Sequence, residues 1–197
     1  MINRRNVLQL LVASAVTPAW ARSGAAENPI ARRLPWSNWS GSQRCLPLAR
    51  KAPATLEQLQ ETIATAVGIV RPVGAGHSFS PLVPTDGTIV SLSRLSGLVE
   101  HDPKTLQASI WAGSRLGDLG QPLEDVGQAL INMPDIDEQA LAGCLATATH
   151  GTGAEIGSMS TFAKALKIVD AQGQLVECDE FKNPDIFQAA RVSLGAV

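Results

Sequence analysis

The sequence has few of the residues that metal sites, nucleic-acid surfaces and hydrolase sites require. Its three histidines, His77, His101 and His150, have neither the i, i+4 spacing nor the fixed loop spacing of metal ligands. The formal net charge is −2, and no basic block occurs beyond the first few residues, which argues against nucleic acid and a polybasic membrane patch. No G-x-S-x-G nucleophile elbow is present. Elimination leaves a small-molecule or cofactor role.

Cysteine is also scarce, and its three positions show no C-x-x-C or zinc-finger spacing. An odd number cannot pair completely within one chain, so we predict buried thiols at Cys45, Cys144 and Cys178. The four tryptophans lack the interleaved basic residues of a nucleic-acid platform. The acidic residues near position 137 could imitate a metal cluster, but negative charge at the amino end of a helix is their more ordinary role. These residues are Asp135, Asp137 and Glu138.

The first 21 residues differ in character from the rest of the chain. Arg4 and Arg5 precede an apolar run over 7–16, and Ala19 and Ala21 offer a cleavage site. This pattern resembles a twin-arginine export signal, which predicts a periplasmic or secreted protein. The apolar run is too short to cross a bilayer, so we predict no transmembrane segment. The alternative is an amphipathic or buried amino-terminal helix.

The whole sequence of 197 residues is 45% hydrophobic and 17% charged, which suits one or two modest domains with cores. Residues 22–36 have the composition of a linker. Thr55 and Gln58 have capping-box spacing at the start of a helix that we expect to end at Gly68. We predict strands over 69–74, 88–95, 97–102 and 106–113, with a turn at 102–104, and a hairpin over 165–179 about Gly173.

Further helices are expected over 115–130, from about residue 137, and from Pro184 with Asn183 as its cap. An extended stretch over 131–134 separates the first two. Helices and strands mix without a regular repeat, so the predicted fold class is α+β, arranged as two small lobes over 37–112 and 113–197.

The stretch RPVGAGHSFS, residues 71–80, places a glycine loop directly after a predicted strand. Gly74 and Gly76 let the backbone turn tightly and aim amide hydrogens at one anion. The loop is not a Rossmann fingerprint, because a third glycine, a following amphipathic helix and a closing acidic residue are missing. A phosphate loop also does not ordinarily need His77. Two readings stay open: a nucleotide or phosphate loop in which His77 is incidental, and a cofactor loop that uses it.

A second segment, residues 134–157, is rich in Ala, Gly and Thr. Small side chains leave a backbone surface that a flat ring or a pyrophosphate can approach closely. Two segments of this kind in one chain favour a bound cofactor.

The order helix, strand and RPVGAGHSFSPL resembles the flavin-binding domain of the vanillyl-alcohol oxidase superfamily (the PCMH type). Within it, the chain is most similar to the sugar-lactone and alditol oxidases, including gulonolactone, arabinonolactone and galactonolactone enzymes. The similarity extends from WSNWSG and PATLEQL to the final FQAARVSLGAV. It implies FAD as cofactor, bonded covalently to His77 through the flavin 8-methyl carbon. A neutral imidazole is a competent nitrogen nucleophile, which is compatible with this role.

The resemblance also implies which residues contact FAD. In the glycine loop these are Pro72, Val73, Gly74, Ala75, Gly76, His77 and Ser78. In the second segment they are Gly143, Cys144, Ala146, Thr147, Thr149 and His150. Ala142 and Gly143 stand where relatives often have two glycines. For His150, a hydrogen bond to the cofactor and a cap on the turn remain alternatives.

The implied activity is oxidation of a CH–OH group of a sugar-1,4-lactone or polyol, by hydride transfer to the flavin. Oxygen, a cytochrome or a quinone would accept the electrons. The family continues past SLGAV into a further strand and a substrate-binding cap domain, so we expect an incomplete flavin domain, inactive alone, whose catalytic base is unassigned. The rival interpretations are a non-catalytic exported nucleotide- or phosphate-binding domain and a decayed fragment of such an oxidase.

Overall fold

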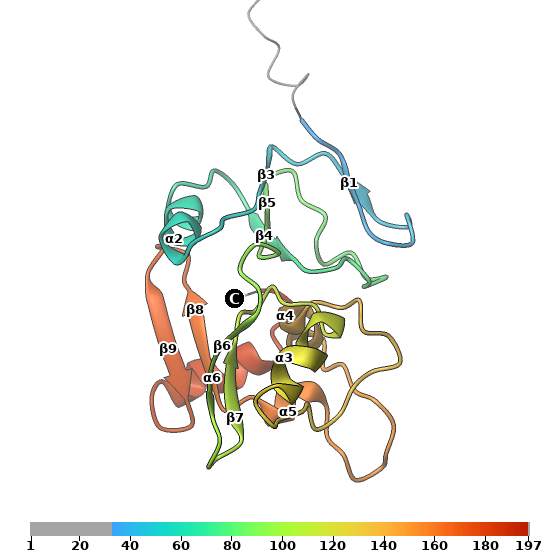
Figure 1. The fold of residues 1–197 in the computed structure, drawn as a ribbon. Helices are drawn as coiled ribbons and strands as arrows, with labels where there is room; N and C mark the ends of the chain where they lie inside the picture. The colour runs from blue at the N-terminus through green and yellow to red at the C-terminus, as the bar shows by residue number, and fades with distance from the viewer. Residues whose placement is uncertain (1–32, 197) are drawn as a thin grey trace, which may run out of the picture. The chain divides into compact units, whose positions relative to one another are not determined.

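A three-stranded parallel sheet carries the glycine loop. The computed structural model describes residues 33–196, and its sheet has the order β3 (Ala49–Lys51), β5 (Thr88–Ser91) and β4 (Val70–Val73) (Figure 1). Thr88, Ile89 and Val90 of the central strand are buried. Both neighbours run parallel to it. The predicted strands over 69–74 and 88–95 are confirmed in position, and β4 ends where the glycines begin.

Helix α2 (Leu56–Ala64) connects β3 to β4. The Thr55 hydroxyl accepts a hydrogen bond from the Gln58 amide at 3.2 Å, as the capping-box spacing predicts, and Gln58 Oε1 accepts from the Ala54 amide. The helix ends at Ala64, a turn before Gly68. The Thr65 hydroxyl donates a hydrogen bond of 2.7 Å to the Glu61 carbonyl, one of the carbonyl groups in the last turn of the helix.

The other strands form three antiparallel hairpins, one before the strands of this sheet in the sequence and two after them. They are β1 (Trp36–Ser37) with β2 (Arg44–Cys45), β6 (Leu98–Asp102) with β7 (Gln107–Ile110), and β8 (Ala165–Val169) with β9 (Leu175–Asp179). The predicted turn after Asp102 is confirmed, since its carboxylate accepts from the Lys104 amide at 2.8 Å. Gly173 has a φ of +76° in the β8–β9 turn, as the hairpin prediction requires.

The single helix predicted over 115–130 is wrong. The chain forms a 3₁₀ turn η3 (Gly117–Leu119) and a short α3 (Gly120–Glu124). Pro122 has no amide hydrogen to bond the carbonyl one turn earlier, so it is disfavoured in the interior of a helix that begins at residue 115 and lies instead in the first turn of the short α3. Gly127, with a φ of +72°, then turns the chain away.

The later helices are α4 (Leu141–Ala146), α5 (Met159–Phe162) and α6 (Pro184–Arg191). Helix α6 begins at Pro184 as predicted. Asn183 precedes it, but its side chain does not cap the helix: the residue is left-handed, with φ +52°, and its amide donates to the Glu177 carbonyl at 2.9 Å.

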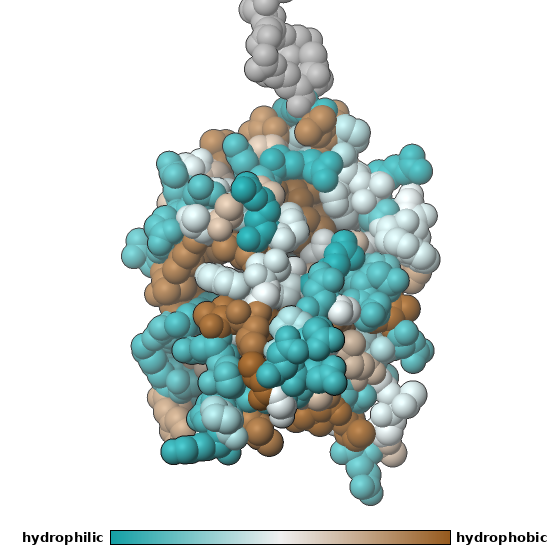
Figure 2. All heavy atoms as spheres, in the orientation of Figure 1, coloured by the Kyte–Doolittle hydropathy of each residue, from teal (hydrophilic) through white to brown (hydrophobic). Residues whose placement is uncertain are grey.

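A buried cluster joins the helices to the β6–β7 hairpin. Its members are Leu116, Leu119, Leu123, Cys144 and Met159, packed against the half-buried Leu98, Ala108, Ile110, Leu130, Leu141 and Leu145. Cys144 and Cys178 are buried as predicted, whereas Cys45 in β2 is only half-buried. On the face in Figure 2, apolar surface lies in separate areas between polar ones.

The α+β class is confirmed by these elements. The division into lobes over 37–112 and 113–197 stays a prediction. The predicted export signal over 1–21 and residues 22–32 of the predicted linker lie outside the described residues. Within residues 33–196, no helix combines the length and apolar character that a membrane crossing needs.

Candidate functional site

The glycine loop leaves β4 with its backbone donors available. Across the described part of the chain, the amides of residues 75–78 donate no hydrogen bond to the protein. Gly76 has a φ of +72°, a left-handed conformation that lets the chain turn shortly after the end of β4. Consecutive amides without protein partners are what a bound anion requires. The loop can therefore bind a phosphate or the polar edge of a cofactor.

The β1–β2 hairpin holds this loop from one side. The Trp39 amide donates to the Gly76 carbonyl at 2.9 Å. The Asn38 side-chain amide donates to the Ser78 carbonyl at 3.0 Å, and that of Gln43 donates to the Phe79 carbonyl at 3.1 Å. The loop carbonyls are thus used for anchoring.

His77 lies between the two anchored carbonyls and is half-buried. Its imidazole stacks on the Trp39 indole, with ring centroids 5.3 Å apart and planes 22° from parallel. Within residues 33–196, neither ring nitrogen of His77 forms a hydrogen bond. The imidazole is therefore held by its face, while its nitrogens form no hydrogen bond to the described residues.

The second segment forms α4 and the turn after it. The Thr147 hydroxyl donates to the Gly143 carbonyl at 2.8 Å, and Ala148 adopts a left-handed φ of +52°. Gln139 Oε1 accepts from Cys144 Sγ at 3.1 Å and from the Thr149 hydroxyl at 3.0 Å. Gln139 thereby joins the helix to the turn.

Cys144 faces the core, so its predicted contact with FAD needs a correction. Its side chain is fully buried, its amide bonds the Ala140 carbonyl, and its carbonyl accepts from Thr149. Burial raises the pKa of the Cys144 thiol to about 11, so the thiol is neutral and unreactive near pH 7. We assign Cys144 to packing beneath the candidate site.

Gly143 is half-buried with open space beside its Cα, and His150 is exposed. A Cβ added to Gly143 would meet no described atom within 4 Å, so its backbone is open to a ligand. His150 is exposed, and its Nδ1 lies 2.8 Å from the carbonyl of the adjacent Gly151. This contact belongs to the turn, while the rest of the His150 ring stays accessible.

The structure brings the two predicted segments together. A Cβ on Gly74 would lie 3.0 Å from Cβ of Ala140, the residue that precedes α4. The turn at 193–196 contacts both segments, because the Leu194 amide donates to the Ala146 carbonyl at 3.0 Å and a Cβ on Gly195 would lie 3.3 Å from the Pro72 ring. Residues from the end of β4, from α4 and from the 193–196 turn form one continuous surface.

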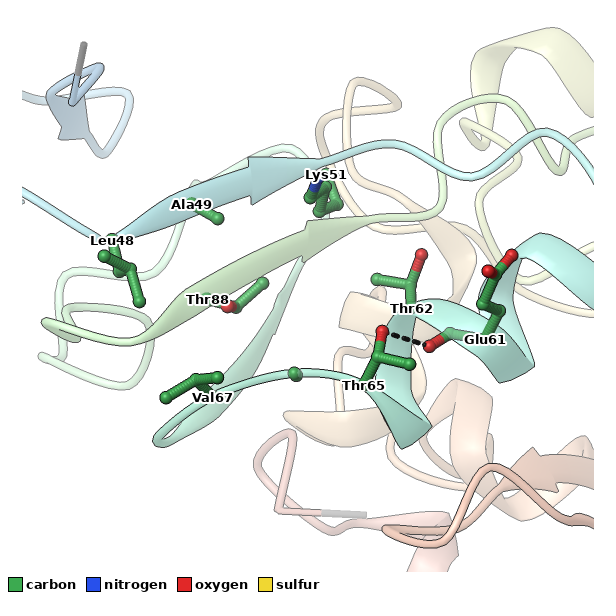
Figure 3. Close-up of a pocket in the computed structure, with 9 residues that line it drawn as sticks. Leu48, Ala49, Lys51, Glu61, Thr62, Thr65, Val67 and Thr88 are labelled. Carbon is green, nitrogen blue, oxygen red and sulfur yellow. Dashed lines mark hydrogen bonds between the residues drawn. The ribbon is translucent and has the colours of Figure 1, made fainter. Parts of the chain in front are cut away.

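The hollow beside helix α2 is separate from this surface. A hollow of about 460 Å³ lies between the sheet and the carboxyl end of α2. Figure 3 shows its lining, which is Leu48, Ala49, Lys51, Glu61, Thr62, Thr65, Ala66, Val67 and Thr88. None of them is a predicted site residue. No group of three or more His, Cys, Asp or Glu side chains in residues 33–196 is placed to hold a metal ion.

The acidic residues before α4 have a different role from the one predicted. Helix α4 starts at Leu141 and has no acidic residue in its first turn, so Asp135, Asp137 and Glu138 do not balance a helix end. Two of them form hydrogen bonds through their backbone carbonyl groups. The Asp137 carbonyl accepts from the Gly117 amide, and the Glu138 carbonyl accepts from the Arg115 guanidinium at 2.9 Å.

Sequence reasoning did not assign a role to Asn38, Trp39, Gln139 or the 193–196 turn. The available signal was the motif WSNWSG, in which two tryptophans enclose a buried asparagine. A buried amide needs several hydrogen-bond partners: those of Asn38 are Ser42 and Gln43 in the same hairpin and the Ser78 carbonyl, 40 positions away in the glycine loop.

The parallel sheet, the glycine loop and the small-residue helix beside it define a mixed α+β domain with a backbone surface for a cofactor. The crystal structure of 6-hydroxy-D-nicotine oxidase from Arthrobacter nicotinovorans has the same fold, with a TM-score of 0.63 and 18% identity over 75% of this chain and 32% of that one. A family model described as FAD binding domain matches residues 47–179. The chain therefore belongs to the FAD-binding domain family of the PCMH type, related to gulonolactone and arabinonolactone oxidases.

Curated relatives agree with this placement. The chain is 38% identical over 165 residues to L-gulono-1,4-lactone dehydrogenase from Mycobacterium tuberculosis, covering 82% of this chain and 38% of the relative. It is 33% identical to L-gulonolactone oxidase from Bos taurus over the same shares, and 34% identical to D-arabinono-1,4-lactone oxidase from Yarrowia lipolytica over 80% and 31%. The chain spans less than two fifths of the length of these relatives.

The residues present fit FAD. The amides of residues 75–78 can donate hydrogen bonds to the anionic part of the cofactor, and the open backbone at Gly143 can lie close to a flat ring or a pyrophosphate. Ala146 and Thr147 continue that small-residue surface. The matched family and the local geometry therefore support the same cofactor.

We expect Gly143→Ala to separate cofactor binding from stability. The new methyl group meets no protein atom, and alanine in a helix interior is favoured over glycine by about 0.5–1 kcal/mol. If FAD approaches this backbone, the methyl group should weaken its non-covalent binding by about tenfold, or about 1.4 kcal/mol. Urea unfolding and FAD titration measure the two effects.

The matched control for Gly143→Ala is Gly120→Ala in α3, where an added Cβ also meets open space among the described atoms. It should leave FAD affinity unchanged. Equal FAD affinity in the wild type and Gly143→Ala would contradict a close approach of the cofactor to α4.

Proposed function

We propose that this chain is the FAD-binding part of an exported oxidoreductase that oxidises a CH–OH group of a sugar-1,4-lactone or polyol, with the flavin attached covalently to His77. The observation that carries the proposal is the position of His77, which lies in a loop of unbonded amides beside the small-residue helix α4. The similarity to lactone dehydrogenases and oxidases supports the substrate class.

Each part of the proposed site has a distinct task. FAD supplies the two-electron acceptor for the hydride of the substrate. The amides of 75–78 would bind and orient it, and the backbone near Gly143 would allow its close approach. The imidazole of His77 would provide the covalent attachment point. Groups that activate the substrate hydroxyl are not assigned to this chain.

The remaining parts of the proposal concern partners and location. Oxygen, a cytochrome or a quinone would reoxidise the flavin. The twin-arginine-like pattern of residues 1–21 supports a periplasmic or secreted protein. Export of this type suits a protein that folds around its cofactor before transport.

The test is anaerobic reduction of the bound flavin in the full-length gene product. L-Gulono-1,4-lactone and D-arabinono-1,4-lactone should bleach the oxidised flavin absorbance, whereas the open-chain aldonates at the same concentration should not. Bleaching by a polyol but not by a lactone would select the polyol branch of the proposal. Tightly bound flavin that no lactone or polyol reduces would contradict the activity. A colourless protein that binds ADP would favour the nucleotide-binding alternative.

A further inference from the structure

We propose that Trp39 is the positioning residue of His77: its indole fixes the plane of the imidazole, so that a ring nitrogen is presented to the cofactor in one orientation. The inference deepens the proposed function, on which its chemical consequence rests. The contact itself is a property of the chain and can be measured without flavin.

The β1–β2 hairpin fixes the backbone of His77 from both sides. Residue 76 is held by the Trp39 amide and residue 78 by the Asn38 side chain, at 2.9 and 3.0 Å. Asn38 is itself buried, and its Oδ1 accepts from the Gln43 amide at 3.0 Å, so it connects the hairpin to the loop. Gly76 packs against this hairpin: a Cβ there would lie 3.6 Å from the Trp36 ring.

With the backbone fixed, the remaining freedom of His77 is rotation of its ring. A near-parallel stack, with centroids 5.3 Å apart, opposes that rotation because turning the imidazole would separate the two faces. Stacking covers a face and leaves the ring edge open, and the ring nitrogens make no hydrogen bond to residues 33–196. Trp39 therefore restricts the ring without blocking its nucleophilic atoms.

The two tryptophans of the β1–β2 hairpin differ in their exposure. The Trp39 side chain is 70% exposed, while Trp36 in the same hairpin is 8% exposed and packs in the usual way. Among the described residues, the aromatic contact of the Trp39 indole is its stack on the His77 ring. The orientation of a reacting group is worth up to about 100-fold in rate for a displacement of 1 Å.

The experiment compares Trp39→Leu, which removes the stack, with Trp39→Phe, which keeps an aromatic face. Trp111→Leu is the matched control, because Trp111 is a partly exposed tryptophan outside the glycine loop and its hairpin. The flavin-free, full-length gene product is prepared with labelled histidine. The rate of covalent FAD incorporation is followed by intact mass, and the His77 ring protons are followed by NMR.

In the wild type we expect upfield-shifted His77 ring protons with cross-relaxation to the Trp39 indole. Trp39→Leu should abolish the shift and slow FAD attachment roughly 10- to 100-fold, while Trp39→Phe and Trp111→Leu stay close to wild type. Absence of the shift and of the cross-relaxation in the wild type overturns the proposal, even if Trp39→Leu does not fold. So does Trp39→Leu attaching FAD at the wild-type rate. If wild type attaches no FAD, the covalent link fails, and the NMR contact alone decides whether Trp39 positions His77.

Discussion

His77→Ala should eliminate the proposed covalent link to FAD and leave any bound flavin dissociable. In the proposed link the His77 imidazole is the nucleophile, and alanine offers no atom that can form the bond. The loop amides of 75–78 and the open backbone at Gly143 are unchanged by the substitution. Non-covalent binding should therefore persist while attachment falls to zero. The measurement is the intact mass of denatured protein, with and without the mass of one FAD.

The control for His77→Ala is His101→Ala. His101 is exposed on β6, opposite Ala108, and lies outside the candidate surface. It should retain the full FAD mass. A persistent FAD mass in His77→Ala would place the attachment at another residue. Wild-type protein that is yellow but carries no added mass when denatured would retain the cofactor and exclude the covalent link.

The elements that sequence reasoning located correctly are those with local causes. Helix α2 starts where the Thr55 cap predicts, and the β8–β9 hairpin turns at Gly173, because a capping hydroxyl and a positive φ act within a few residues. The prediction of one helix over 115–130 was wrong because it rested on the hydrophobic spacing and gave too little weight to Pro122. Proline lacks the amide hydrogen that a helix interior needs, and the chain forms only the short α3 there.

The candidate site was only partly predictable for a different reason. The glycine loop and the α4 segment each carry a composition that favours a cofactor, and the structure places them side by side through Gly74 and Ala140. The anchoring of the loop depends on contacts across about 40 residues, from Asn38 to Ser78. Spacing rules describe neighbours along the chain and carry no information about such pairs. The same limit applies to Cys144, which the sequence predicts both as a buried thiol and as a contact of FAD.

Gly113→Ala should be the most destabilising of the glycine substitutions discussed. An added Cβ would lie 1.8 Å from the Leu92 carbonyl oxygen and 2.8 Å from that of Leu95, and both obstacles are backbone. Neither can rotate aside as a side chain can, so the chain itself must shift. Overpacking of this kind costs about 1–3 kcal/mol, and occasionally more. The urea midpoint should fall accordingly, with an unchanged slope.

The strain at Gly113 should also reach the candidate site. Its neighbours on either side hold the start of α4, since the Ala112 carbonyl accepts from the Ala142 amide at 2.9 Å and the Ser114 carbonyl accepts from the Leu141 amide at 2.8 Å. Displacing this segment displaces the helix that carries Gly143, so FAD affinity should fall together with stability. Gly143→Ala is the opposite control, because it should lower FAD affinity without lowering the urea midpoint. If Gly113→Ala lost stability yet bound FAD as tightly as wild type, the position of α4 would not depend on this anchor.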